Sequence, residues 1–222
     1  MKISPTLTEV KEIAKTGKYD ILPVSCEILS DFITPIEAMR ILQNVSTHCY
    51  LLESAQANEA WGRYTFLGYD PKLEINCIDG HMKLGKLSVE TENPSEYIRQ
   101  ILSEYKSPKF DYLPSFTGGL VGYFSYDYLG YKEKSIRGKA RNTEDFKDVD
   151  LMLFDKVIAF DNLCQKIILI ANMSLDAPET GYNKAIVELK QLRELLMHGE
   201  KKQNMGGKLL GEVTPLFEKE QY

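Results

Sequence analysis

The chain has 222 residues, enough for one large domain or two small ones. It carries 27 Lys and Arg against 32 Asp and Glu, so it lacks the basic excess through which many proteins bind nucleic acids. Its first residues lack the apolar stretch of a signal peptide, and no run approaches the ~18 apolar residues of a membrane helix. We therefore expect a cytoplasmic protein that binds neither nucleic acid nor membrane.

The first third of the chain alternates between helical and strand patterns. Residues 6–16 predict a short helix that ends at Gly17, and residues 21–28 predict a strand. Residues 34–37 (TPIE) combine a capping threonine, a proline in the first turn and a glutamate three residues after the cap. This signal predicts a helix that runs to about Asn44.

Strand patterns dominate the rest of the chain. The predicted strands are residues 49–53, 63–69, 73–78, 81–84, 119–125, 151–160 and 166–171. The pair Asp79-Gly80 predicts a hairpin turn, residues 93–96 (NPSE) repeat the helix-start signal, and residues 179–197 predict the longest helix. Because hairpins outnumber helical crossovers, we expect an α+β fold of antiparallel sheets with flanking helices.

The predicted organisation is one region at residues 1–198, a polar, glycine-containing linker at 199–211, and a short final segment at 212–222. The final segment is too short to form a domain. We therefore interpret the chain as one piece of a larger protein.

The cysteines and histidines do not form a metal-binding pattern. Short ligand spacings are typical of zinc sites, whereas the four cysteines and three histidines here are scattered. We expect four reduced, mostly buried thiols and no metal site. Asp155 and Asp161 flank one predicted strand, and we interpret them as surface residues.

Two glycine-containing stretches come close to the patterns of nucleotide-binding loops but lack their essential features. Residues 80–87 have two glycines five positions apart followed by Lys86, but Leu87 stands where such a loop needs Ser or Thr. Residues 116–124 are rich in glycine without the order of a dinucleotide fingerprint, and tight packing against a neighbouring strand is the favoured explanation. No nucleophile stands beside a base, so we expect no catalytic residue.

One group of residues suggests a binding site for an amino acid. Glu53 and Ser54 end a predicted strand and could bind an ammonium group, while Arg63 on the next strand could bind a carboxylate. Tyr64 or Phe66 could line an apolar slot between them. The alternative is structural, with Glu53 and Ser54 ending a strand and Arg63 paired with a surface acid.

The same residues carry a resemblance to the N-terminal region of anthranilate synthase component I. The matching elements, in family order, are residues 51–54 (LLES), 63–68 (RYTFLG), 116–127 (FTGGLVGYFSYD) and a strand that ends at 159–161 (AFD). They span nearly the whole chain, and residues 117–127 are the most specific of them. The resemblance implies that the fold is part of the layered α/β/β/α sandwich of the chorismate-using synthases.

The resemblance also implies a function. The family's enzyme is a lyase that converts chorismate and ammonia to anthranilate and pyruvate with Mg²⁺ in tryptophan biosynthesis, and a glutamine amidotransferase partner (component II) supplies the ammonia. Ser54, Glu53 and Arg63 would contact L-tryptophan at the allosteric feedback site. The metal ligands, the chorismate site and the catalytic residues would lie in a C-terminal domain that begins near residue 212. This chain would then be regulatory and scaffolding, with no cofactor of its own, within a hetero-oligomer.

Two other functions remain open at the level of sequence. Aminodeoxychorismate synthase component I, from the folate pathway, shares the N-terminal architecture but makes a different product. A non-catalytic module that binds an amino acid is the other alternative. Glu53 and Ser54 favour anthranilate synthase, because together they resemble a working feedback element.

Overall fold

A computed structural model describes residues 1–53, 62–133, 135, 145–203, 206–207 and 209–212. Its strands form a six-stranded sheet and a five-stranded sheet, in which every pairing is antiparallel. The six-stranded sheet has the order β1(Ile3–Ser4), β2(Ile21–Leu29), β11(Lys166–Ser174), β10(Lys156–Asp161), β4(Tyr64–Tyr69), β3(Cys49–Leu52). The five-stranded sheet has the order β7(Leu87–Glu90), β6(His81–Leu84), β5(Leu73–Ile78), β9(Val149–Phe154), β8(Gly119–Phe124). The helices are α1(Leu7–Lys15), α2(Pro35–Val45), α3(Pro94–Ser103), the 3₁₀ helix η1(Tyr126–Tyr131) and α4(Pro178–His198).

Capping residues explain where the first two helices begin. Thr34 accepts a hydrogen bond from the backbone N–H of Glu37, whose carboxylate accepts one from the Thr34 backbone, so the predicted capping box is present. Thr6 and Glu9 form a second capping box at α1. Helix α3 also starts at the predicted place, but the Asn93 side chain does not cap it and bonds the side chains of its neighbours instead.

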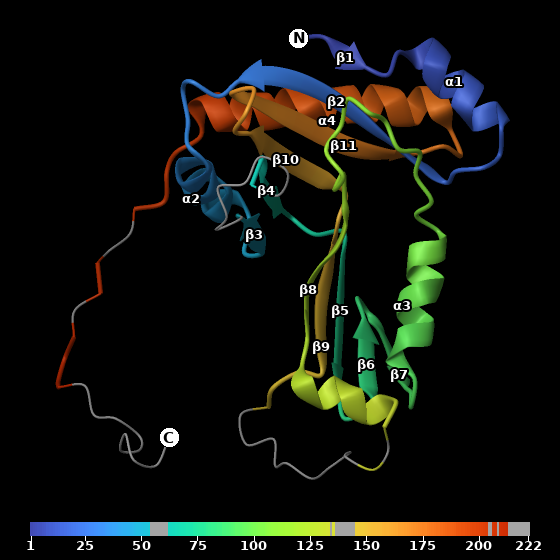
Figure 1. The fold of residues 1–222 in the computed structure, drawn as a ribbon, viewed down its shortest axis with the longest axis vertical. Coiled ribbons are helices and arrows are strands. Elements are labelled where there is room, and N and C mark those ends of the chain that lie inside the picture. The colour runs from blue at the N-terminus through green and yellow to red at the C-terminus, as the bar shows by residue number, and fades with distance from the viewer. Residues whose placement is uncertain (54–61, 134, 136–144, 204–205, 208, 213–222) are drawn as a thin grey trace.

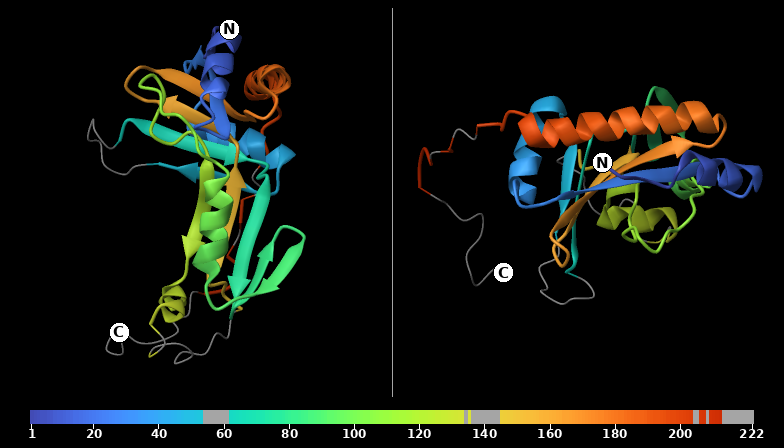
Figure 2. Two further views of the ribbon diagram at one scale, coloured as in Figure 1. Left: turned by 90° about the vertical axis from the view of Figure 1, so that its right-hand side faces the viewer. Right: turned by 90° about the horizontal axis from the view of Figure 1, so that it is seen from above.

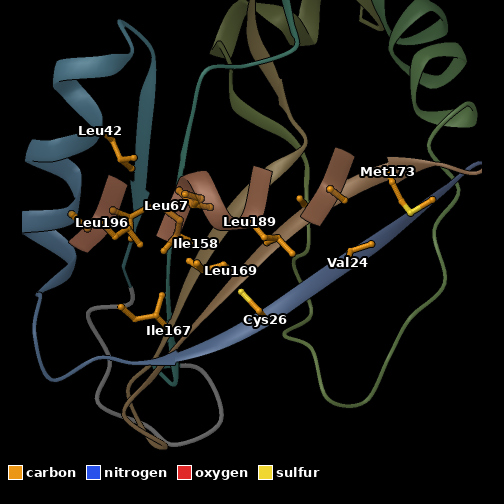
Figure 3. Packing of buried hydrophobic residues seen from close by; sticks show 14 of the residues in the cluster. Val24, Cys26, Leu42, Leu67, Ile158, Ile167, Leu169, Met173, Leu189 and Leu196 are labelled. Atoms are coloured by element: carbon orange, nitrogen blue, oxygen red, sulfur yellow. The ribbon is translucent and has the colours of Figure 1, made fainter. Parts of the chain in front are cut away.

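The main core lies between the six-stranded sheet and three helices. Alternate residues of β2, β10 and β11 point towards α1, α2 and α4, and Figure 3 shows Leu169 and Ile158 facing Leu189 of α4. The opposite face of this sheet carries a smaller cluster in which Ile168, Ile170 and Val157 pack against the segment that contains Leu113 and Phe116. Figure 2 shows α4 running along the sheet.

Among the described residues, helices pack on one face of the five-stranded sheet. Ile75, Met82 and Leu151 point to the face on which α3 packs, and this cluster is smaller than the main core. The opposite face carries partly exposed polar residues such as Asp150 together with Tyr123. Figure 1 shows this sheet extending away from the helices of the six-stranded sheet.

The two sheets share continuous stretches of chain, and one of them corrects the sequence prediction. Residues 151–160 were predicted as one strand, but the chain breaks at Asp155 between β9 and β10, which belong to different sheets. The side chain of Asn172 holds this junction, because its Nδ2 donates to the carbonyl oxygens of Asp155 (3.0 Å) and Thr117 (2.6 Å). The apolar residues on both sides of Asp155-Lys156 do not distinguish one long strand from two, since both halves are buried.

The glycine-rich strand β8 approaches its neighbour closely. A Cβ atom on Gly122, whose φ is +151°, would lie 1.9 Å from the backbone oxygen of Asp150. This confirms tight packing against a strand as the reason for the glycine. Gly80 lies in the β5–β6 turn and Gly85 in the β6–β7 turn, so residues 80–87 belong to a meander.

These observations confirm an α+β fold of antiparallel sheets with flanking helices. The four cysteines are free thiols, of which Cys26 and Cys77 are buried and Cys164 is exposed. Across the described residues, none of the helices has both the length and the apolar character needed to cross a bilayer. Helix α4 ends at His198, and the next residues stay close to α2, because Lys202 and Arg40 exchange hydrogen bonds through the Lys202 backbone.

Candidate functional site

The predicted amino-acid site lies at one edge of the six-stranded sheet, where β3 pairs with β4. The register places Leu52 opposite Phe66, so the residue that follows, Glu53, lies near the start of β4. Glu53 is exposed to solvent. Ser54, the other predicted contact from this segment, lies outside the described residues, so its place is still a prediction.

Arg63 immediately precedes β4 and pairs with Asp161 at the end of β10. Its Nε donates to Asp161 Oδ1 at 3.0 Å and its Nη2 donates to Asp161 Oδ2 at 2.6 Å, a side-on arrangement with two hydrogen bonds. The register of β4 and β10 sets this contact, because Asp161 lies opposite Tyr64. The guanidinium also lies over the ring of Tyr64, 4.9 Å from its centroid.

The prediction that Asp161 lies on the surface is wrong. Its side chain is only 3% exposed, and besides Arg63 it accepts hydrogen bonds from the backbone N–H groups of Leu163 and Cys164. These bonds, the one from Arg63 above all, hold the pKa of the Asp161 carboxyl below its ordinary value. Asp161 therefore stays ionised at neutral pH and closes the β10–β11 turn.

An apolar surface lies beside these charged groups. Tyr64 and Phe66 share one face of β4, with ring centroids 5.8 Å apart, and Phe66 packs edge-on against Phe116 at 5.6 Å. Leu52 on the adjoining strand is 46% exposed. The interpretation that Tyr64 and Phe66 line an apolar slot agrees with this half-exposed arrangement.

Three kinds of group thus lie at or beside the paired ends of β3 and β4. Glu53 supplies a carboxylate, Arg63 supplies a guanidinium, and the side chains of Leu52, Tyr64 and Phe66 supply an apolar surface. An amino acid with a large apolar side chain offers the complementary groups, namely an ammonium, a carboxylate and a flat apolar body. We call these five residues the β3–β4 edge site.

The described cavities lie elsewhere. One of about 410 Å³ is bordered by Ser25 and Ile168, and another of about 420 Å³ lies between α1 and Tyr112; neither is lined by Glu53 or Arg63. The described residues also hold no group of three or more His, Cys, Asp or Glu side chains placed to bind a metal.

Neither a role for Asn162 nor the contact of Asp161 with Arg63 is recognised from the sequence. Asn162 donates from its backbone to the Arg63 carbonyl (2.9 Å) and from its side chain to Thr65 (3.3 Å). The Asp-Asn pair at a hairpin turn is the signal that could have found them. Tyr50 was also missed: it is 8% exposed, and its hydroxyl has no hydrogen-bond partner among the described residues.

The curated relatives named below are all described as anthranilate synthase component 1 or probable anthranilate synthase component 1. The chain is 33% identical over 198 residues to anthranilate synthase component 1 of Acetivibrio thermocellus and 35% identical over 197 residues to that of Pseudomonas aeruginosa. These alignments cover 86% and 85% of this chain but 39% of each relative, so the chain spans about two fifths of their length. A third relative, the probable anthranilate synthase component 1 of Schizosaccharomyces pombe, is 29% identical over 199 residues.

The chain was also compared with protein-family models and with solved structures. No family model matches the chain. The crystal structure of anthranilate synthase component I from Streptococcus pneumoniae TIGR4 aligns with 75% of this chain and 36% of its own, with 25% sequence identity and a TM-score of 0.49. Along about 85% of its own length, the chain is therefore related by sequence to anthranilate synthase component 1.

Proposed function

We propose that the chain is the N-terminal regulatory and scaffolding part of an anthranilate synthase component 1. The observation that carries the proposal is the similarity to anthranilate synthase component 1 proteins along most of this chain. In the complete protein, residues 1–198 would form this region, 199–211 the linker and 212–222 the start of the chorismate-binding domain. The complete enzyme would act in the cytoplasm as a lyase, together with a glutamine amidotransferase.

The chemistry of the proposed reaction belongs to the part of the enzyme outside this chain. That part would bind chorismate and Mg²⁺ and form anthranilate and pyruvate from chorismate and ammonia. No step of the reaction is assigned to the residues described here. Their proposed role is to hold the six-stranded sheet in shape, and with it the edge where β3 and β4 end.

We further propose that the β3–β4 edge site takes part in feedback inhibition by L-tryptophan. Glu53, with Ser54 beside it in the sequence, would bind the ammonium group of the inhibitor, and Arg63 would face its carboxylate. The half-exposed apolar surface of Tyr64 and Phe66 suits an indole ring, because aromatic rings pack edge-on or offset against one another. The remaining contacts would come from the part of the protein outside this chain.

Anthranilate fluorescence tests the reaction. The complete protein is incubated with chorismate, Mg²⁺ and ammonium, and anthranilate formation is followed with and without tryptophan. We expect anthranilate from the complete protein, inhibited by tryptophan, and none from residues 1–222 alone. Formation of aminodeoxychorismate instead would place the protein in the folate pathway. Anthranilate formed by residues 1–222 alone would show that the chemistry is wrongly located.

A serine substitution tests the feedback site. Micromolar binding corresponds to about 8 kcal/mol, and one hydrogen bond to a charged group contributes roughly 1.5–3 kcal/mol. Ser54→Ala in the complete protein should therefore weaken tryptophan inhibition about tenfold or more while chorismate turnover stays nearly unchanged. Ser88→Ala, at an exposed position on β7, is the matched control and should leave inhibition unaltered. Unchanged inhibition in Ser54→Ala would remove Ser54 from the site.

A further inference from the structure

The ion pair between Arg63 and Asp161 is held more firmly than an ordinary surface pair. Asp161 is buried, whereas the Arg63 side chain is 37% exposed. The Asp161 carboxylate is itself fixed by the backbone N–H groups of Leu163 and Cys164, both at 3.1 Å. The position of Arg63 is thus set from the β10–β11 turn, a part of the chain about a hundred residues away in sequence.

The backbone around Arg63 is fixed from the same turn. Asn162 donates its backbone N–H to the Arg63 carbonyl at 2.9 Å, and its side chain reaches Thr65 at 3.3 Å. The ring of Tyr64 supports the guanidinium from one side. Main chain and side chain of Arg63 are therefore both held in place before any ligand binds, which lowers the entropy cost of binding one.

The side-on pairing leaves part of the guanidinium available. Asp161 takes the Nε and Nη2 groups, and Nη1 donates no hydrogen bond to any residue in the described part of the chain. A guanidinium has five N–H donors in a rigid plane, so it can bind one carboxylate along one edge and a second along another. Asp161 already balances the charge of Arg63. A ligand carboxylate would therefore be attracted mainly because Nη1 is held in a fixed orientation, and less because of a net positive charge.

We infer that Asp161 is a positioning residue for ligand binding: it orients Arg63 so that Nη1 receives the carboxylate of an amino acid at the β3–β4 edge site. This inference rests on the proposed function, since it names how the feedback site recognises the carboxylate of its inhibitor. Asp161 would act on the ligand through Arg63, without contacting the ligand itself. It also explains why a buried carboxylate stands beside an arginine that remains partly exposed.

The test compares two inhibitors on the complete protein. Tryptophan carries the carboxylate, whereas L-tryptophanamide lacks its charge and keeps the indole and the ammonium. In the unmodified protein, tryptophan should inhibit anthranilate formation more strongly than the amide. Asp161→Asn should weaken inhibition by tryptophan about tenfold and inhibition by the amide about twofold or less, because Arg63 keeps its charge but loses the carboxylate that orients its Nη1 group.

Two further variants separate positioning from folding. Arg63→Lys keeps the charge but loses the planar donor, so it should show the same selective loss for tryptophan. Asp161→Glu keeps the carboxylate and should recover part of the preference for tryptophan over its amide. If Asp161→Asn does not fold, Asp161→Glu carries the test, because it keeps the charge of the pair but displaces the carboxylate that orients Arg63; a preference for tryptophan over its amide as large as in the unmodified protein would overturn the positioning role.

The outcomes distinguish the inference from the function on which it rests. Full-strength tryptophan inhibition in both Asp161→Asn and Arg63→Lys overturns the positioning role and leaves the feedback function standing. Equal weakening of tryptophan and the amide also overturns it, since it shows a structural role alone. A complete protein that makes anthranilate without any inhibition by tryptophan contradicts the feedback function and the inference with it.

Discussion

The two sheets of the molecule differ in how their faces are covered. The six-stranded sheet has three helices on one face and a loop segment with Leu113 and Phe116 on the other. The five-stranded sheet has α3 and η1 packed on a single face, and its outer strand β8 leaves Tyr123 and Phe124 exposed. We therefore expect the six-stranded sheet to be the more stable of the two.

This difference bears on the location of the proposed site. The β3–β4 edge site lies on the well-covered sheet and is fixed by a buried carboxylate, as a binding site that must hold its geometry requires. In the part of the chain that the structure describes, β8 pairs with β9 alone, and Tyr123 and Phe124 on it are exposed. Such an edge is typical of a surface that another part of a protein covers. Four predictions test the contrast, from the largest expected effect to the smallest.

The largest effect is expected in the main core. Leu169→Ala removes a side chain that is completely buried between β11 and α4, and it should lower the free energy of unfolding by about 2–5 kcal/mol. Leu151→Ala in the five-stranded sheet should cost less, near the lower end of that range. Urea unfolding followed by circular dichroism measures both, with the exposed Leu163→Ala as control. Equal losses at Leu169 and Leu151 would contradict the contrast between the sheets.

The second prediction concerns the outer strand β8. Gly122→Ala places a methyl group against the backbone oxygen of Asp150 and strains a φ of +151°, which should cost about 1–3 kcal/mol. Amide hydrogen exchange should become faster in β8 and β9 and stay unchanged in β11. Gly206→Ala is the control, because a Cβ atom there meets nothing within 4 Å. Faster exchange throughout both sheets would show that they open as one unit.

The third prediction uses the lowered pKa of Asp161. A carboxyl whose pKa is lower in the folded state stabilises the fold above its unfolded value of about 3.9, and this contribution is lost as the pH falls through the folded pKa. Asp161→Asn should cost about 1–2 kcal/mol at pH 7, a modest value because Arg63 is partly exposed. The variant should also lose stability less steeply below pH 4.

The measurement is chemical denaturation at a series of pH values between 7 and 2.5. Asp111→Asn, an exposed aspartate with no hydrogen bond described for its side chain, is the control and should behave like the unmodified chain. Identical acid profiles for the unmodified chain and Asp161→Asn would show that the ion pair contributes nothing to folding.

The smallest effect has the opposite sign. The hydroxyl of Tyr50 is buried without a partner among the described residues, and burial raises its pKa strongly. Tyr50→Phe removes the desolvated group and keeps the ring against Phe154, so it should raise stability by up to about 1 kcal/mol. Thermal unfolding measures the change. A loss of stability would indicate that the hydroxyl has a partner, such as a buried water molecule.

Most helices and strands could be predicted from the sequence, because capping residues, turn residues and apolar patterns within each segment favour the structure that the segment adopts. The helix that begins after Thr34 and the hairpin at Asp79-Gly80 depend on capping and turn chemistry within a few residues. The break at Asp155 was missed, because both adjoining strands are apolar and only their separation into two sheets distinguishes them. The short strands β1 and β7 were missed for a related reason, since pairing partners rather than their own sequence define them.

The binding role of Glu53, Ser54 and Arg63 stays a prediction. The structure shows that Glu53 follows β3 and that Arg63 precedes the adjoining strand β4, and it shows Arg63 paired with an acid, as the structural alternative expected. Which acid pairs with Arg63, and that this acid is buried, was not predicted, because Asp161 lies about a hundred residues further along and only the pairing of β4 with β10 brings them together. Such a long-range contact leaves no trace in the spacing of residues within a single sequence.

The most direct test of the account is amide hydrogen exchange of the complete protein with and without L-tryptophan. If the six-stranded sheet carries the feedback site, tryptophan should slow exchange at the end of β3, the start of β4 and the β10–β11 turn, and should leave β6 and β7 unchanged. Protection of these three segments is the result that the account predicts. No protection there under conditions in which tryptophan inhibits the enzyme would contradict it.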